Sequence, residues 1–412
     1  MGSTWQDHGL SDPVEAFREA FDGSTPTHFS RAPGRVNLMG EHTDYNGLPV
    51  LPMALRQEIR LLFRPRAHGT VRMMNRNPEF PPRSFNLSDP IAPGPAGDWE
   101  NYLKAPCQAL LRLLGPLRGL DGLVTSTLPV ASGLSSSSAL VIAMARALLH
   151  ANEVEVPTLE LAEEMARAER YTGTQGGGMD QAISLGARAG HASRVEFGPL
   201  RLYESSVPPD WRFVVAHTMV RAEKSGRAQE AYNRRNKECQ EALRKIGPAL
   251  SAAGMADAET LSYPELMARL SLRDLLELGR VHLAGPVLGR FRHVVTEALR
   301  VYRSEEAMRQ EDLLAFGLLM DASHESLRTD YEVSSNELDR LVALAREGGA
   351  AGARLTGAGF GGCVVALTDP FRLDRLLGTL EKGYYRPMTL SHPLREVLFV
   401  AQPSRGASVE EV

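Results

Sequence analysis

A glycine- and serine-rich run between an apolar strand and an apolar helix constrains the fold of this chain most. The run reads PVASGLSSSSA at residues 129–139, with a strand predicted before it at residues 122–128 and a helix after it at residues 137–150. Glycine allows positive φ, so successive N–H groups can point into one concavity, and the positive end of the following helix suits a phosphate. The Walker pattern GxxxxGK[ST] is absent, so a phosphate loop and a helix-capping turn both stay open.

Two further glycine-rich segments follow in the sequence. RLTGAGFGGCVVAL, residues 354–367, places four glycines between two apolar strands. A hairpin needs fewer, so the backbone there either lies close to another group or makes a tight corner or bulge. TGTQGGGMDQAIS, residues 172–184, places Asp180 two residues after a run of three glycines. An Asp at such a place is commonly a cap or turn residue, and it can also accept a proton from a hydroxyl nucleophile in phosphoryl transfer. Arg35 is a candidate cation partner.

Polar residues are dense in GRVNLMGEHTDYNG, residues 34–47. Glu41, His42 and Asp44 resemble a metal-ligand set, but this spacing is a weak zinc signal. Residues two apart in a strand face the same side, so His42 and Asp44 can line one pocket. Carboxylate and imidazole groups can bond sugar or polyol hydroxyls. A structural turn and a polar-ligand site are therefore equally compatible with this segment.

Composition excludes several classes of function. Lys plus Arg (46) nearly balance Asp plus Glu (50), giving a net charge of -4, which argues against a nucleic-acid or membrane-surface partner. The three cysteines, Cys107, Cys239 and Cys363, form neither a disulfide framework nor a zinc motif. The N-terminus lacks a signal-peptide pattern, and the longest apolar stretch, residues 139–149, is too short to span a bilayer. We expect a cytoplasmic protein with a small-molecule partner, and a monomer.

The order of strand and helix signals predicts an α+β fold with two domains. Length favours two domains, and the composition changes near residue 208, so we expect domains at residues 1–208 and 209–412. Strand and helix signals mix in both halves without regular βαβ alternation. The predicted strands are residues 36–39, 57–63, 71–74, 122–128, 213–216, 353–355, 363–367 and 397–401, with more short strands after residue 178. The predicted helices include residues 99–114, 137–150, 159–170 and 227–246, and residues 78–95 are expected to form a surface loop.

Taken together and in order, the segments at residues 34–47, 129–139 and 354–367 resemble the three motifs of the GHMP small-molecule kinases. GRVNLMGEHTDYNG is similar to the galactokinase signature, and SLRTDYEVSSNELDRLV, residues 326–342, resembles the C-terminal half of that subfamily. The resemblance runs from about residue 29 to residue 367. It implies a two-domain GHMP fold with the active site in the cleft between the domains. It also implies transfer of the ATP γ-phosphoryl group, with Mg²⁺, to the anomeric hydroxyl of D-galactose.

The resemblance also assigns roles to individual residues. Arg35 and Asp180 match the catalytic pair, and Ser137 and Glu169 match positions near Mg²⁺. Trp99 matches an aromatic residue near the adenine, although a tryptophan that packs in the core is an equally good interpretation. The residues expected to bind the sugar are Glu41, His42, Asp44, Gly178 and Tyr232. The residues expected to wrap the ATP phosphates are Gly133, Leu134, Ser135, Ser136, Ser137 and Ser138.

Two alternatives remain within this resemblance. Ordinary galactokinases carry a Cys-Gly-Ile-like run before Met-Asp, whereas this chain has three glycines, residues 176–178. This resembles the N-acetylgalactosamine 1-kinases, since smaller residues leave room for an acetamido group at C2. Galactose is preferred because it is the commoner family substrate. A catalytically silent sugar and ATP sensor is the second alternative, but the Ser138-Ala139 dipeptide that inactive relatives lose is present here.

Overall fold

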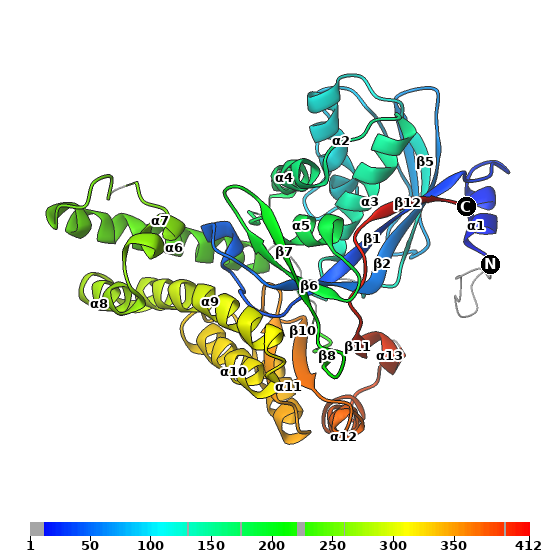
Figure 1. Ribbon diagram of the computed structural model, residues 1–412. Helices are drawn as coiled ribbons and strands as arrows, with labels where there is room; N and C mark the ends of the chain where they lie inside the picture. The colour runs from blue at the N-terminus through cyan, green and yellow to red at the C-terminus, as the bar shows by residue number, and fades with distance from the viewer. Residues whose placement is uncertain (1–11, 130–131, 174, 221–226, 259, 391–392) are drawn as a thin grey trace.

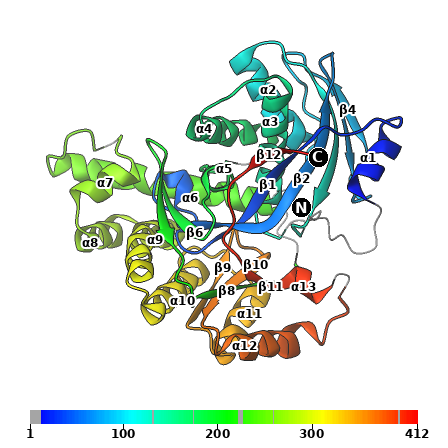
Figure 2. The same cartoon turned by 45° about the vertical axis from the view of Figure 1, so that its right-hand side comes forward.

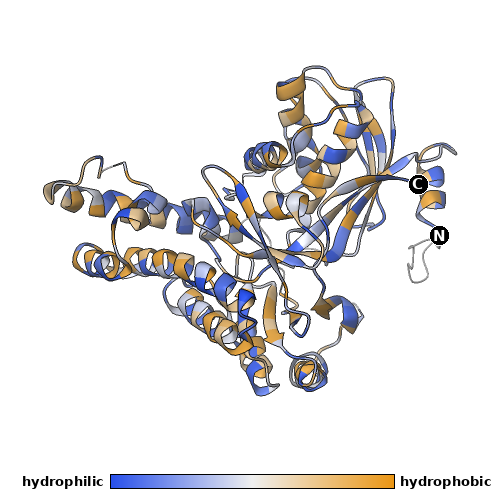
Figure 3. Cartoon of the chain, viewed as in Figure 1, coloured by the Kyte–Doolittle hydropathy of each residue, from blue (hydrophilic) through white to orange (hydrophobic). Residues whose placement is uncertain are grey.

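Two β-sheets, each covered by helices, make up the two halves of the molecule in the computed structural model (Figure 1). The structure describes residues 12–129, 132–173, 175–220, 227–258, 260–390 and 393–412. The mixture of helices and sheets confirms the predicted α+β class. Two large clusters of buried apolar residues form the core. Hydrophilic and hydrophobic residues alternate along most of the helices (Figure 3).

The first half is built on a six-stranded sheet with the order β12-β1-β2-β5-β3-β4. Strand β1 pairs antiparallel with both β2 and β12, and β3 pairs parallel with β5. Ile59, Leu61 and Phe63 of β2 enter the main core, while Leu62 faces the opposite side and packs with Phe17 of α1 (Pro13–Ala20). The strands are β1 (His28–Asn37), β2 (Pro52–Pro65), β3 (Thr70–Asn75), β4 (Arg83–Asn86), β5 (Leu120–Ser126) and β12 (Ser408–Glu411).

Four helices cover one face of this sheet: α2 (Glu100–Leu114), α3 (Ser136–Ala151), α4 (Thr158–Glu169) and α5 (Met179–Gly186). Helix α3 is apolar almost all round and packs against β1, β2 and α2, so most of its side chains are buried. A short 3₁₀ turn, Arg170–Thr172, follows α4. The buried helix α3 gives the glycine- and serine-rich run before it a rigid base.

The second half is built on a four-stranded sheet with the order β11-β8-β10-β9. A separate two-stranded sheet, which precedes residue 208 and therefore belongs to the first half of the chain, pairs β6 with β7. The strands are β6 (His191–Glu196), β7 (Arg201–Ser206), β8 (Arg212–His217), β9 (Gly352–Thr356), β10 (Cys363–Thr368) and β11 (Leu398–Ala401). The helices are α6 (Arg227–Ala252), α7 (Tyr263–Arg269), α8 (Leu272–His282), α9 (Gly285–Arg309), α10 (Leu313–Thr329), α11 (Asn336–Glu347), α12 (Leu373–Leu380) and α13 (Leu394–Val397), with a π-helical turn at Glu381–Tyr385.

Most of the elements expected from the sequence occur in the structure, with several differences. The strand expected at residues 36–39 overlaps the end of a longer strand, β1, and the sequence did not predict α1 or β12. Residues 179–186 form helix α5 where short strands were expected, because Asp180, Gln181, Ile183 and Ser184 are all buried and no two-residue alternation develops. Strand β4 lies within the expected surface loop at residues 78–95, where it pairs with β3 at the edge of the sheet.

The chain crosses between its halves more than once. The expected division near residue 208 falls in the loop between β7 and β8, yet β12 at the end of the chain returns to pair with β1 of the first sheet (Figure 2). We therefore propose the division near residue 208 for the bulk of the chain, with β12 as a returning strand. Throughout the part of the chain that the structure describes, no helix is both long and apolar enough to cross a membrane.

Candidate active site

The structure brings the two predicted catalytic residues together. Arg35 lies near the end of β1 and Asp180 in the first turn of α5, and Arg35 Nε donates to Asp180 Oδ1 over 2.7 Å. Arg35 Nη1 also donates to the Gly133 carbonyl over 2.7 Å. Burial alone lowers the pKa of Arg35, but the carboxylates of Asp180 and Glu41 raise this pKa overall. The guanidinium is therefore a fixed charge that joins Asp180 to the glycine- and serine-rich run.

The start of α3 has the features of a phosphate-binding turn. Gly133 has φ +77° and Ser135 has φ +63°, so the backbone turns sharply before the helix begins. Leu134 is buried, and its carbonyl accepts from Arg35 N over 3.1 Å. Within the described residues the Ser135 hydroxyl is buried without a hydrogen-bond partner. An orphaned hydroxyl beside free helix N–H groups fits a bound oxyanion. Residues 130 and 131 of the predicted loop lie outside the described part of the chain.

Hydroxyl and carboxylate oxygens converge beside this turn. Ser138 Oγ donates to Glu169 Oε2 over 2.9 Å and lies 3.3 Å from Asp180 Oδ2. Ser137 Oγ lies 3.5 Å from Glu169 Oε1, and Ser136 is the first residue of α3. Oxygen donors of this kind are those that Mg²⁺ prefers. The sequence analysis selected Ser137 but not Ser138 for the metal, and the structure places Ser138 closer to both carboxylates.

The segment at residues 38–47, which we call the polar loop, follows β1. In this loop Glu41 is buried and its carboxylate faces the second half of the molecule. Its Oε1 accepts from Gly357 N over 2.6 Å, and its Oε2 accepts from Arg354 Nη2 over 2.7 Å. Asn37 Nδ2 also donates to Oε2 over 2.7 Å. Glu41 therefore joins the polar loop to the glycine-rich segment at residues 354–367 in the second half.

Both ring nitrogens of His42 have partners within the protein. Nε2 lies 3.2 Å from the Ala358 carbonyl, and Nδ1 lies 2.9 Å from the Tyr45 hydroxyl. Because a carbonyl only accepts, Nε2 carries the proton and Nδ1 accepts from Tyr45. Burial, followed by the neighbouring His293, lowers the pKa of His42 well below its usual value. His42 is therefore neutral, and its contact with a sugar stays a prediction.

Asp44 and the glycines before Asp180 meet at close range. Gly177 N donates to Asp44 Oδ2 over 3.1 Å, and a Cβ on Gly177 would lie 2.3 Å from the Asp44 carbonyl carbon. Burial and the nearby Asp180 raise the pKa of Asp44. Gly178, which the sequence analysis selected, has φ +106° and faces Ala166 instead. Gly177 is thus a site residue that the sequence analysis missed, although it lies in the same three-glycine run.

An aromatic cluster borders the polar loop. Tyr232 of α6 has its ring centroid 5.5 Å from that of His42 and 5.4 Å from that of Tyr45. Burial raises the pKa of Tyr232 well above its ordinary value, so its hydroxyl stays protonated. Tyr331 lies 4.7 Å from His42, and its hydroxyl lies 2.6 Å from that of Tyr45. Tyr232 therefore lies beside the polar loop, and its contact with a sugar stays a prediction.

Trp99 lies in the core of the first half. Its Nε1 donates to the Pro81 carbonyl over 3.0 Å, and its ring packs 6.0 Å from that of Phe80. This agrees with the packing interpretation of Trp99. A contact with adenine stays a prediction.

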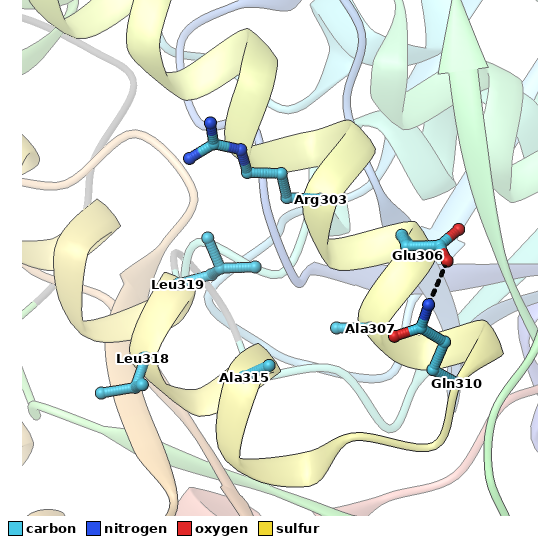
Figure 4. Close-up of a pocket in the computed structure, with 7 residues that line it drawn as sticks. All are labelled: Arg303, Glu306, Ala307, Gln310, Ala315, Leu318 and Leu319. Carbon is cyan, nitrogen blue, oxygen red and sulfur yellow. Dashed lines mark hydrogen bonds between the residues drawn. The ribbon is translucent and has the colours of Figure 1, made fainter.

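A separate hollow of about 370 Å³ lies between α9 and α10 (Figure 4). No predicted site residue lines it. Its described lining residues are Arg303, Glu306, Ala307, Gln310, Ala315, Leu318 and Leu319. Among the described residues, no cluster of three or more His, Cys, Asp or Glu side chains is arranged to hold a metal ion. The metal predicted near Ser137 and Glu169 stays a prediction.

Three family models match separate parts of the chain. A galactokinase galactose-binding signature matches residues 15–65, which include Arg35 and the polar loop. The GHMP kinase N-terminal domain matches residues 101–187, which include the start of α3 and Asp180. The GHMP kinase C-terminal model matches residues 304–386, which include the glycine-rich segment at residues 354–367.

Whole-chain comparisons agree with these matches. A galactokinase of Chloroflexus aurantiacus is 38% identical over 380 residues, covering 91% of this chain and 92% of the relative. The crystal structure of Lactococcus lactis galactokinase complexed with galactose matches with a TM-score of 0.85 and 29% identity, covering 96% of this chain and 98% of that one. The mevalonate kinase of Methanococcus jannaschii, at 19% identity and a TM-score of 0.60, shares the fold. The chain therefore belongs to the galactokinase family of the GHMP kinases.

Proposed function

We propose that this protein is an ATP-dependent galactose 1-kinase, which converts D-galactose and ATP into galactose 1-phosphate and ADP. The observation that carries the proposal is the buried Arg35–Asp180 pair, which lies between the polar loop and the turn before α3. The two galactokinases named above, from Chloroflexus aurantiacus and Lactococcus lactis, support galactose as the acceptor. The three-glycine run at residues 176–178 is the one feature that favours N-acetylgalactosamine, and none of the relatives named above carries that sugar in its name.

In the proposed reaction the C1 hydroxyl oxygen of galactose bonds to the γ-phosphorus while the bond to the β–γ bridging oxygen breaks. ADP leaves, and the hydroxyl proton passes to, or is oriented by, Asp180. Arg35 offsets negative charge on the transferred phosphoryl group. Because the transition state is loose, positioning and fixed charges supply most of the acceleration, and Asp180 need not be a strong base.

The sugar would be held by groups from both halves. Asp44 and Glu41 offer carboxylate oxygens in the polar loop, and Tyr232 offers a hydroxyl and a ring face from α6. The close contact of Gly177 with Asp44 supports a fixed orientation of that carboxylate. Both ring nitrogens of the neutral His42 already bond to Tyr45 and Ala358. Its proposed contribution to sugar binding is therefore packing of the ring against the sugar.

We assign ATP binding to the turn before α3, where Gly133, Leu134 and the serines at residues 135–138 present backbone and hydroxyl groups. The donor set of Ser137, Ser138 and Glu169 fits a hard divalent cation such as Mg²⁺. When bound, that ion would neutralise phosphate charge. Ser138 holds Glu169 and faces Asp180, so it would keep both carboxylates oriented toward the phosphates.

An ADP-release assay over galactose, N-acetylgalactosamine, glucose and mevalonate tests this function. We expect release with galactose, dependent on Mg²⁺. Release with N-acetylgalactosamine alone would overturn the choice of sugar, and release with mevalonate alone would overturn the subfamily. Absence of release with every acceptor would favour a silent sensor. We also propose a monomer, which would elute from a sizing column near its mass of 45.0 kDa.

A further inference from the structure

Two side chains of helix α9, in the second half, form hydrogen bonds with the backbone of the polar loop in the first half. Glu297 Oε1 accepts from Gly40 N over 3.0 Å and from Glu41 N over 3.3 Å. One turn earlier on the same helix face, His293 Nε2 lies 3.0 Å from the Glu41 carbonyl. Both side chains are fully buried. A single helix therefore satisfies both the N–H and the C=O of Glu41.

The protonation of His293 follows from its partners. Because the Glu41 carbonyl only accepts, His293 Nε2 must carry a proton and donate. Its Nδ1 lies 2.9 Å from Ser326 Oγ, which can donate to it. Burial lowers the pKa of His293 to about 4. His293 is thus a neutral donor with one fixed tautomer near neutral pH.

Glu297 is a buried carboxylate with its charge compensated. Ser323 Oγ donates to Oε1 over 2.7 Å, and Arg300 Nε donates to Oε2 over 2.6 Å. Burial raises the pKa of Glu297, but the positive charges of Arg300 and Arg354 contribute to lowering it overall. An ionised carboxylate accepts N–H bonds more strongly than a neutral acceptor. The polar loop is therefore held by a charge-assisted contact.

The loop adopts a conformation that needs such support. Gly40 has φ +92° and His42 has φ +63°, so both residues flanking Glu41 lie in the left-handed region, which is unfavourable for His42. A Cβ on Gly40 would lie 2.8 Å from Val301 Cγ2 of α9 and 2.8 Å from the Pro49 carbonyl oxygen. The loop is thus pressed directly against α9.

Helix α9 is itself anchored on both sides. Its Val301 and Met308 pack in the core that contains β1 and α3, while Phe291 and Val294 pack in the core of the second half. A helix that belongs to both cores has little freedom to shift relative to either. Groups on α9 are therefore a fixed reference for the polar loop.

From these contacts we propose that Glu297 and His293 are positioning residues for the sugar site. They hold the backbone at Glu41, which sets where the side chains of Glu41 and Asp44 face. This proposal rests on the proposed function, since it assigns the polar loop to the sugar. Neither residue touches the reacting atoms, so their loss should change the affinity for galactose more than the handling of ATP.

The test measures the KM for galactose and for ATP in three variants. His293→Leu removes the donor to Glu41, and Glu297→Gln removes the charge that accepts from the loop. We expect each to raise the galactose KM about tenfold or more, as loss of a buried hydrogen bond does, and to change the ATP KM less than about twofold. His293→Gln keeps an N–H donor and should recover most of the galactose affinity. Hydrogen exchange of a peptide covering residues 38–48 should accelerate in the first two variants.

Two controls separate positioning from general damage. Glu58→Gln removes a buried carboxylate of β2, paired with Arg31 and Arg60, and should leave the galactose KM unchanged even if stability falls. Glu306→Gln removes a partly exposed carboxylate from α9 and should change neither KM.

Unchanged galactose KM in both His293→Leu and Glu297→Gln, or equal increases in both KM values, would overturn the proposal. If Glu297→Gln does not fold, the His293→Leu and His293→Gln pair decides. A wild-type protein that does not phosphorylate galactose counts against the proposed function instead, and the series is then measured with the hexose that it accepts.

Discussion

At the scale of single residues, the site depends on how each buried charge is compensated. Arg35 is balanced by Asp180 and by the Gly133 carbonyl, and Glu41 by Arg354 and Gly357 N. Without such partners, burial of an ion is strongly unfavourable. These contacts fix the orientation of Arg35, which the proposed phosphoryl transfer needs, and of Glu41, which the proposed sugar site needs.

The contact between Gly177 and the polar loop leads to the first residue-scale prediction. Gly177→Ala would place a Cβ 2.3 Å from the Asp44 backbone, so the loop must move. We expect the galactose KM to rise about tenfold or more and stability to fall by about 1–3 kcal/mol. Steady-state kinetics and urea unfolding measure both.

The neighbouring glycine is the matched control. Nothing lies within 4 Å of a Cβ built on Gly176, so Gly176→Ala should retain both affinity and stability. Equal effects of the two substitutions would show that the close contact at Gly177 does not govern the sugar site.

At the scale of elements, two helices prepare the site in different ways. Helix α3 is buried on nearly all sides and presents its N-terminus to the proposed phosphates. Helix α9 supplies Glu297 and His293 to the polar loop. Buried helices of this kind move little, so the groups at their ends and on their faces are preorganised.

The buried histidines of α9 and α10 predict how stability depends on pH. Burial lowers the pKa of His293 and of His324 to about 4, against 6.5 in the unfolded chain. Between these values the unfolded chain binds more protons, so stability falls as pH decreases from about 6.5 toward 4. Each group contributes up to about 1.4 kcal/mol per pH unit in this window.

Urea unfolding of wild type and His293→Gln at pH 7, 6 and 5 measures the contribution of His293. The variant should lose less stability than wild type between pH 7 and pH 5. His282→Gln, at an exposed position on α8, should follow the wild type. Identical pH dependence in wild type and His293→Gln would contradict the buried, neutral state of His293.

At the scale of the whole molecule, the proposed site lies where the two halves meet. Arg35, Asp180 and the polar loop belong to the first half, while Arg354, Tyr232 and the α9 pair belong to the second. Glu41 joins them, since groups of the second half bond to its N–H, its carbonyl and its carboxylate. Closure of the halves would therefore affect the sugar site directly.

The sequence predicts the parts of this site that have unusual composition. Glycine-rich turns and the dense polar loop mark Arg35, Asp180 and Glu41, because backbone approach and hydroxyl binding require those residue types. Glu297 and His293 give no such signal, since they lie within an ordinary helical pattern and act only through tertiary contact. Whether Gly177 or Gly178 belongs to the proposed site depends on which of the two contacts Asp44 in the folded chain. The pairing of β12 with β1 likewise joins segments that are far apart in the sequence. Local patterns encode neither.

The most direct test of the central claim is single-turnover kinetics of Asp180→Asn together with calorimetric titration of galactose. The amide keeps the size of the side chain and a hydrogen bond to Arg35, but it removes the charge and the proton acceptor. We predict that galactose still binds with an affinity within about tenfold of wild type, while phosphoryl transfer slows by about 10²–10⁴-fold. Transfer at near wild-type rate would contradict the assignment of Asp180 and, with it, the proposed mechanism.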